Sequence, residues 1–148
     1  MMSGGSYEQD TDDSSLRVSQ VVKGEMSAKT TYQRSAKGPV SISECTADGK
    51  CIILENTGRK EEFLGGWSIK RNIDGMDKAN FTLDKNFTIR PAGKVKIFSA
   101  GQLPGNSGPY DIEANVASWG IGANITTSLI NPSGDSRATH NQRTMYSS

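Results

Sequence analysis

Residues 65–71 read Gly65-Gly66-Trp67-Ser68-Ile69-Lys70-Arg71, an alternating run that contains one of the chain's two tryptophans. Successive side chains of a β-strand point to opposite faces, so Trp67 and Ile69 share one face and the polar residues between them share the other. The two glycines before the tryptophan permit a sharp entry or a close backbone approach. The run therefore predicts a half-buried strand that Trp67 anchors in the core of a small β-sandwich.

Short strands and turn signals continue on both sides of this run. Asp48-Gly49 lies between two alternating runs at residues 40–45 and 51–56, a pattern that is typical of a hairpin. Asp74-Gly75 predicts a second tight turn directly after the tryptophan strand. No stretch has the period of an amphipathic helix, so the predicted fold class is all-β, a sandwich over residues 38–143. Its other expected strands cover residues 79–83, 87–89, 94–98, 125–130 and 137–141.

Large apolar side chains on these strands define the predicted core. Val95 and Ile97 alternate with lysines, as expected for a strand with one buried face. The second tryptophan follows a long loop that is rich in glycine and proline. The predicted structural core contains Trp67, Ile69, Phe81, Phe98 and Trp119.

The two ends of the chain lack a sustained strand or helix period. Residues 1–37 are rich in Ser, Thr, Gly, Asp and Lys and have few large apolar residues, so they are predicted to form a disordered linker. Residues 16–22 are an exception that can form a transient strand or an edge contact. Phosphorylation of Ser and Thr residues in the linker remains open as an alternative to a plain tether. Residues 144–148 are predicted to fray.

Charge is unevenly distributed, although the 148-residue chain carries a formal net charge of only +1. The charged residues at the start of the linker are all acidic: Glu8, Asp10, Asp12 and Asp13. The small net charge argues against whole-molecule electrostatic capture of nucleic acid or of an anionic membrane. No apolar run is long enough to cross a bilayer, and the start lacks the pattern of a secretory signal. A cytosolic or nuclear location is therefore expected.

Cys45 and Cys51 are the only cysteines. An Asp48-Gly49 turn would place Cys51 opposite Thr46, so the two thiols would be diagonal and not directly paired across the hairpin. A disulfide would need a different register, and a reducing compartment disfavours it further. No further ligands for a metal lie near the two cysteines, so they are predicted to be two reduced, buried, structural thiols.

No arrangement typical of an enzyme is found. His140 is the only histidine and lies in an expected terminal strand, where a surface or edge-strand position is favoured over a catalytic or ligand role. The paired carboxylates Glu61-Glu62 and Asp12-Asp13 lie in polar segments and are interpreted as solvated charge. We expect no catalytic, cofactor-binding or metal site and no small-molecule substrate.

Basic residues concentrate in the central third of the chain. Lys70, Arg71, Lys94 and Lys96 form the candidate interaction face, provided that the strands align them on one surface. Such a face can contact an acidic partner or the phosphates of a nucleic acid. The alternative is that outward lysines keep the strands soluble and resist edge pairing.

Three glycosylation patterns begin at Asn80, Asn86 and Asn124. They would suit a secreted adhesion domain, in which these asparagines carry glycans. Without a secretory signal, the patterns are interpreted as ordinary strand-end residues beside core positions.

Five segments, in this order and spacing, carry a family resemblance: Glu55-Asn56, Gly65-Gly66-Trp67-Ser68-Ile69-Lys70-Arg71, residues 87–101, Ser118-Trp119-Gly120 and Asn131-Pro132-Ser133-Gly134-Asp135. Through them, residues 38–143 resemble the lamin tail domain, the immunoglobulin-like module of lamins and of invertebrate-type cytoplasmic intermediate filament proteins. The resemblance implies an immunoglobulin-like β-sandwich. In the family an Ile-Trp pair often stands where this chain has Ile97-Phe98, which leaves an aromatic in place.

The cytoplasmic branch of this family is favoured over the nuclear lamins. Residues 1–37 have no run of consecutive basic residues for nuclear import, and the last residues contain no cysteine for prenylation. Residues 137–143 look like the last strand of the cytoplasmic proteins. A filament also needs a long heptad-patterned rod, which this sequence lacks, so the chain is expected to be either a cut-out tail or a rod-less product.

The resemblance implies a structural and interaction module, the C-terminal globular tail of a cytoplasmic intermediate filament protein. Its expected role is lateral association of filaments or docking of partners, and its expected partners are parent filament subunits and other proteins, not membranes. The alternative is a nuclear lamin-type tail that binds chromatin or nucleic acid through a basic strand face.

Overall fold

The regular secondary structure of the described part of the chain is entirely β-strand. The computed structural model describes residues 15–23 and 26–147, and it has twelve strands and no helix in these ranges. They are β1 (Ser15–Lys23), β2 (Met26–Ala36), β3 (Val40–Cys45), β4 (Cys51–Asn56), β5 (Glu62–Phe63), β6 (Ser68–Ile73), β7 (Met76–Thr82), β8 (Thr88–Ile89), β9 (Lys94–Phe98), β10 (Ile112–Glu113), β11 (Asn124–Ile130) and β12 (Ser136–Ser147). The predicted all-β class is confirmed.

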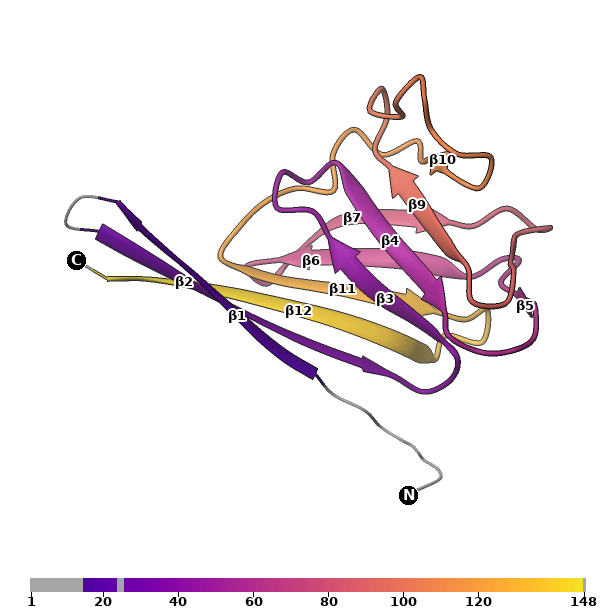
Figure 1. Cartoon of the computed structure of the whole chain (residues 1–148), viewed down its shortest axis with the longest axis horizontal. Coiled ribbons are helices and arrows are strands. Elements are labelled where there is room, and N and C mark those ends of the chain that lie inside the picture. The colour runs from indigo at the N-terminus through magenta and orange to yellow at the C-terminus, as the bar shows by residue number, and fades with distance from the viewer. Residues whose placement is uncertain (1–14, 24–25, 148) are drawn as a thin grey trace.

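Two sheets pack face to face as a sandwich (Figure 1). The larger sheet has six antiparallel strands in the order β1-β2-β12-β11-β6-β7, and the smaller has four in the order β10-β9-β4-β3. In the smaller sheet only β10 runs parallel to its neighbour β9. A short β5-β8 pair completes the structure.

Both predicted hairpins are present, although the first turn is centred on Ala47 and Asp48, where Gly49 N–H donates to Thr46 O at 3.1 Å, and not on Asp48-Gly49. Asp74 and Gly75 have φ values of 50° and 87°, so both adopt the left-handed conformation that a two-residue hairpin turn requires. This turn places Ile73 opposite Met76 between β6 and β7. At the other hairpin, Thr46 N–H donates to Cys51 O at 2.9 Å, which confirms the predicted position of Cys51 opposite Thr46.

The core draws on both sheets, and Trp119 is its largest member. Trp119 and Ile69 are completely buried, and the indole Nε1–H of Trp119 donates to Ile97 O at 3.1 Å. Phe81 packs edge-on against Trp119 with ring centroids 6.4 Å apart, and it is only partly buried. The other fully buried aliphatic side chains are Ile42, Ile52, Leu54, Leu64, Leu83, Ile89, Val95, Ile97 and Leu129.

Of the predicted core residues, Trp67 lies at the margin of the core and Phe98 lies outside it. Trp67 packs against the core cluster but is only partly buried, because it precedes β6 and also lines a shallow depression of about 240 Å³ together with Pro39 and Arg137. Phe98 is also only partly buried and does not belong to the core cluster. It follows the buried Ile97 directly, so the alternation of β9 turns its ring to the outer face of the smaller sheet.

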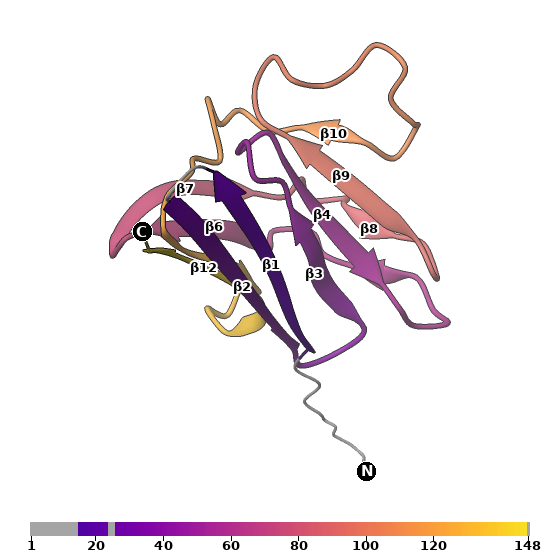
Figure 2. The same ribbon diagram turned by 60° about the vertical axis from the view of Figure 1, so that its left-hand side comes forward.

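The structure differs from the predicted disorder of residues 1–37. Residues 15–23 and 26–36 form β1 and β2, and β2 pairs with β12 from Ala36↔Ala138 to Ser27↔Ser147. Together β1, β2 and β12 form a ribbon that extends beyond the sandwich (Figures 1 and 2). Residues 1–14 lie outside the described residues.

The backbone ladder explains why this ribbon was missed. Few apolar side chains mark β2, and hydroxyl pairs join it to β12 instead, such as Ser35 with Thr139 at 2.8 Å and Thr30 with Thr144 at 3.0 Å. Partner strands of this kind stabilise a segment without giving it an apolar period. For the same reason β12 continues to Ser147, where the sequence predicted fraying from residue 144.

Candidate interaction surfaces

The four residues of the predicted interaction face do not share a surface. Lys70 is exposed on β6 of the six-stranded sheet, whereas Lys94 and Lys96 are exposed on β9 of the other sheet. The outer faces of the two sheets point in opposite directions. Arg71 is buried, with 1% of its side chain exposed. The predicted single basic face is therefore wrong, and with it the arrangement that chromatin binding through these four residues requires.

Arg71 braces the interior of the sandwich. Its Nε–H donates to Trp119 O at 3.0 Å, its Nη2–H to Gly120 O at 3.1 Å, and its Nη1–H to the Thr127 hydroxyl at 2.7 Å. Burial lowers the pKa of this guanidinium, because the charged form loses its hydration. Alternation along β6 already indicated this position, since Arg71 lies two residues after the buried Ile69.

The two cysteines are free and buried, as predicted. The Cys45 thiol donates to the Thr127 hydroxyl at 3.6 Å, so it belongs to the same buried cluster as Arg71. Burial raises the pKa of Cys45, and it raises the pKa of Cys51 to about 11. Both thiols therefore stay protonated near neutral pH, which agrees with a structural role.

His140 is not on the surface, so that prediction is wrong. Only 2% of it is exposed, because β12 runs between β2 and β11 in the middle of the large sheet. Its ring lies 6.0 Å from the ring of Tyr32, centroid to centroid. Among the residues that the structure describes, no group of three His, Cys, Asp or Glu side chains is placed to hold a metal ion.

Another buried polar residue, Asn56, lies at the C-terminal end of β4 and holds the neighbouring loops. Its Nδ2 donates to Lys60 O at 2.8 Å, Ile89 O at 3.1 Å and Arg90 O at 3.2 Å, and its Oδ1 accepts from Gly58 N–H at 2.9 Å. This residue belongs to the Glu55-Asn56 segment of the family resemblance. Its contacts are all internal, so its role is to hold the scaffold together.

The outer face of the six-stranded sheet consists of the residues of β2, β12, β11, β6 and β7 that point away from the core. Strand pairing arranges neutral polar side chains across it: Gln33, Ser35, Thr126, Ser128, Thr139 and Asn141. Its exposed charges are cationic at Lys29, Lys70 and Arg143, and Asp77 is its one carboxylate among the described residues of these strands.

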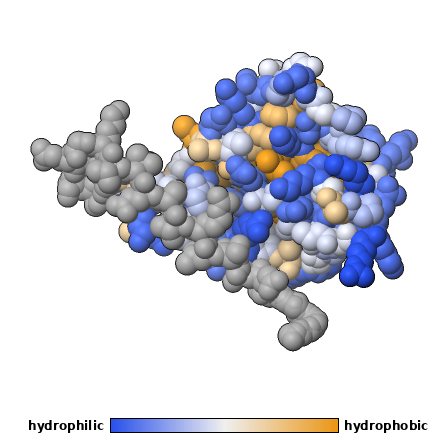
Figure 3. Space-filling model, viewed as in Figure 1, coloured by the Kyte–Doolittle hydropathy of each residue, from blue (hydrophilic) through white to orange (hydrophobic). Residues whose placement is uncertain are grey.

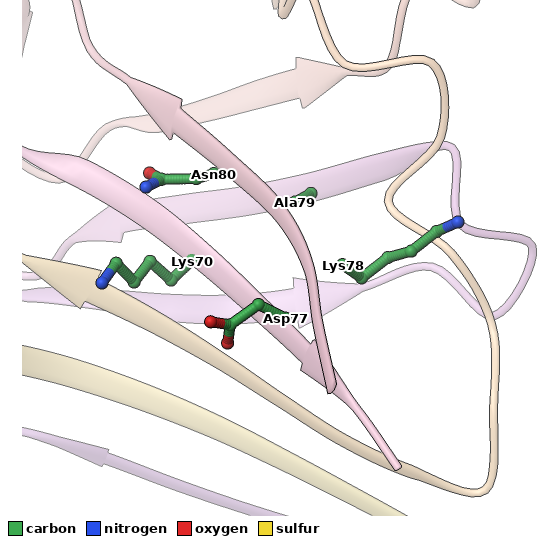
Figure 4. A pocket seen from close by; sticks show the side chains of 5 residues that line it. All are labelled: Lys70, Asp77, Lys78, Ala79 and Asn80. Carbon is green, nitrogen blue, oxygen red and sulfur yellow. The ribbon is translucent and has the colours of Figure 1, made fainter. Parts of the chain in front are cut away.

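A pocket of about 250 Å³ lies at the edge of this face, and Figure 4 shows the side chains that line it. Lys70, Asp77 and Asn80 lie together on the outer side of β6 and β7, whereas Lys78 extends away from them. Asp77 accepts a hydrogen bond from Asn72 Nδ2 at 3.2 Å. Lys70 makes no ion pair with any residue that the structure describes.

The outer face of the four-stranded sheet has a different composition. Glu55 pairs in register with Lys94, and Ile53 lies between Lys96 on β9 and Glu44 on β3, so positive and negative charges are balanced. Figure 3 shows apolar atoms interrupting a largely hydrophilic surface on this side of the molecule. This mixed surface is typical of a solvated sheet face.

A groove of about 580 Å³ with a mixed apolar and charged lining lies where the β6–β7 turn meets the segment after Trp119. Two exposed apolar side chains, Met76 and Ile121, line it with 74% and 67% of their surfaces exposed. Gly120 packs so closely on Ile73 that a Cβ at this glycine would lie 2.5 Å from Ile73 Cδ1. No sequence pattern indicated this groove, since Met76 and Ile121 are distant in the chain.

Comparison with known proteins decides the family. Residues 33–144 match the Lamin Tail Domain. This chain belongs to the lamin tail domain family. The match covers most of the chain and confirms the resemblance and the immunoglobulin-like fold.

Three relatives show the kind of protein in which this tail domain occurs. The chain is 49% identical over 124 residues to intermediate filament protein ifa-2 of Caenorhabditis elegans, covering 83% of this chain and 21% of that protein. It is 45% identical over 137 residues to intermediate filament protein A of Ascaris suum, covering 89% and 26%. It is 44% identical over 130 residues to muscle cell intermediate filament protein OV71 of Onchocerca volvulus, covering 85% and 29%.

The chain thus spans less than a third of the length of these curated relatives. They are cytoskeletal, structural proteins and not enzymes, which supports the expected structural, non-enzymatic class of this tail domain. The described residues include no helix that is long and apolar enough to cross a membrane.

Proposed function

We propose that this chain is the C-terminal globular tail of a cytoplasmic intermediate filament protein and that it mediates lateral association of filaments or docks partner proteins. One observation carries the proposal: residues 33–144 match the lamin tail domain, and relatives at 44–49% identity are much longer intermediate filament proteins. The similarity of residues 137–143 to the last strand of cytoplasmic members favours the cytoplasm over the nucleus.

The distribution of polar groups supports docking as the mode of action. Arg71, Asn56 and His140 are all buried, and the side-chain hydrogen bonds of the first two go to the protein's own backbone or to Thr127. The interior therefore acts as a rigid frame. Recognition on such a frame occurs through the exposed sheet faces, strand edges and loops.

An immunoblot of the source tissue with an antibody against residues 38–143 tests the proposal. We expect a band several times heavier than the 15.9 kDa of this chain, retained in the pellet after high-salt detergent extraction. Pre-absorption of the antibody with the purified chain is the control. A soluble band at the size of this chain would instead show a free-standing β-sandwich and would contradict the filament role.

A further inference from the structure

We propose that the outer face of the six-stranded sheet binds the acidic segment formed by residues 8–13 of the same chain. The contact is independent of the proposed filament function. It concerns a surface on which Ser35 bonds to Thr139 and Thr126 to Asn141, while Lys70 and Arg143 make no ion pair with a described residue.

The chemistry of the face favours an acidic ligand. Lys29, Lys70 and Arg143 are exposed on it, and neither Lys70 nor Arg143 has an ion pair with a described residue. Its single carboxylate, Asp77, lies at the β7 edge and already accepts a hydrogen bond from Asn72. Between the cations lie amide and hydroxyl side chains, which can donate further hydrogen bonds to carboxylates.

The acidic segment is complementary in charge. Residues 1–14 contain Glu8, Asp10, Asp12 and Asp13 and no Lys, Arg or His. The side chains of residues 1–14 therefore carry a charge of −4, which is opposite in sign to the net charge of the outer face. The opposite sheet offers no comparable target, because Glu44 and Glu55 balance Lys94 and Lys96 there.

The spacing of the charges also agrees. Lys70 aligns with Ser128 and then Thr139, and Arg143 lies four residues further along β12. With about 3.4 Å per residue and about 4.8 Å between strands, the two cations are about 17 Å apart. An extended segment from Glu8 to Asp13 spans about the same distance, and alternate carboxylates at Glu8, Asp10 and Asp12 then share one side.

The chain is long enough to make this contact within one molecule. Ser15 begins β1, which lies four strands from β6 and therefore about 19 Å from the row that carries Lys70. Glu8 precedes Ser15 by seven residues, which reach about 23–25 Å when extended. A second copy is not needed for the acidic segment to lie across the face.

Zero-length cross-linking of the full chain with a carbodiimide tests the contact, because this reagent joins carboxylates to lysine amines that touch them. We expect mass spectrometry to find cross-links from residues 8–13 to Lys70 or Lys29 within the monomer. These cross-links should be lost in about 0.5 M NaCl, because salt at this concentration screens the attraction between carboxylates and cations beyond a few ångström. The exposed Lys94 and Lys96 on the opposite sheet are internal controls and should give none.

Three results would overturn the proposal: no cross-link to Lys70 or Lys29, equal yields at Lys94 and Lys96, or cross-links found only in a dimer. The last would assign the acidic segment to a second copy. A variant with Glu8→Gln, Asp10→Asn, Asp12→Asn and Asp13→Asn gives an independent readout. We expect its amide NMR shifts to change at Thr126, Asn141 and Arg143 but not at Ile53 or Lys94; unchanged shifts at the first three would also refute the contact.

Discussion

The two faces of the six-stranded sheet are made by alternate residues of the same strands, yet they differ in every physical respect. On the inner face Arg71 makes three hydrogen bonds in the buried interior. On the outer face its neighbour Lys70 is exposed and makes none with the described residues. The comparison teaches that charge in the sequence does not report exposure, whereas position relative to a buried residue such as Ile69 does.

The largest effect should come from the completely buried tryptophan of the inner layer. We expect Trp119→Ala to lower the free energy of unfolding by about 3–5 kcal/mol, because it opens a cavity and removes the bond to Ile97 O. Trp67→Ala should cost less, about 1–3 kcal/mol, since Trp67 is only partly buried. Urea unfolding measures both; a larger loss for Trp67 would restore it as the central anchor.

The next effect concerns the segment that Arg71 holds. Gly120 has a φ of 85°, and a Cβ there would meet Ile73 Cδ1 at 2.5 Å, so Gly120→Ala should destabilise by about 2–4 kcal/mol. Gly101→Ala is the matched control, because Gly101 has a φ of 79° with open space around it. Its cost should be the backbone strain alone, about 1 kcal/mol. Equal melting temperatures for the two variants would contradict close packing at Gly120.

A smaller difference is expected between two adjacent residues of β11. The Thr127 hydroxyl accepts from both Arg71 and Cys45, so Thr127→Val should cost about 1–3 kcal/mol by leaving a buried donor unsatisfied. Ser128→Ala on the outer face should change stability by less than about 0.5 kcal/mol. If chemical denaturation gives the two variants the same stability, the inner cluster is not stabilising.

The smallest expected effect is a dependence of stability on alkaline pH. Folding raises the pKa of Cys51 from 9.0 to about 11 and also raises the pKa of Cys45, so the folded state binds these protons more tightly. The contribution is fully present below pH 9 and is lost as pH rises toward 11. Calorimetric melting temperatures should fall over this range. The melting temperature of the double variant Cys45→Ala, Cys51→Ala should fall less steeply over the same range; an identical slope would refute the thiol contribution.

Sequence reasoning reached the fold class, both hairpins, the free thiols and the family. These features follow from local rules, such as the left-handed turn at Asp74-Gly75 and the alternation of β9. It named residues 16–22, which form most of β1, only as a transient strand or edge contact, and it missed β2, because a backbone ladder and hydroxyl pairs with β12 stabilise β2 without an apolar period. Sequence reasoning also placed Arg71 on the surface because Arg71 is charged, although it lies two residues after the buried Ile69 and therefore on the same face of β6.

Which tryptophan is central could not be read from the sequence either. Both follow glycine-rich segments, and burial depends on what the other sheet presents to each. Trp119 donates a hydrogen bond to Ile97 O and packs against the Phe81 ring, whereas Trp67 lines the depression beside Pro39. The acidic charge of residues 8–13 can be read from the sequence. The proposed complementary face cannot, because its cations come together only when β2, β12, β11 and β6 pair in one sheet.

The contrast between the two faces is tested most directly by urea unfolding of Arg71→Ala beside Lys70→Ala. We expect Arg71→Ala to lower the free energy of unfolding by about 2–5 kcal/mol, because two backbone carbonyls and the Thr127 hydroxyl lose their buried donor. We expect Lys70→Ala to change it by no more than about 0.5 kcal/mol. Equal losses for the two variants would contradict the contrast between the faces, since they would mean that Arg71 is no more part of the interior than Lys70.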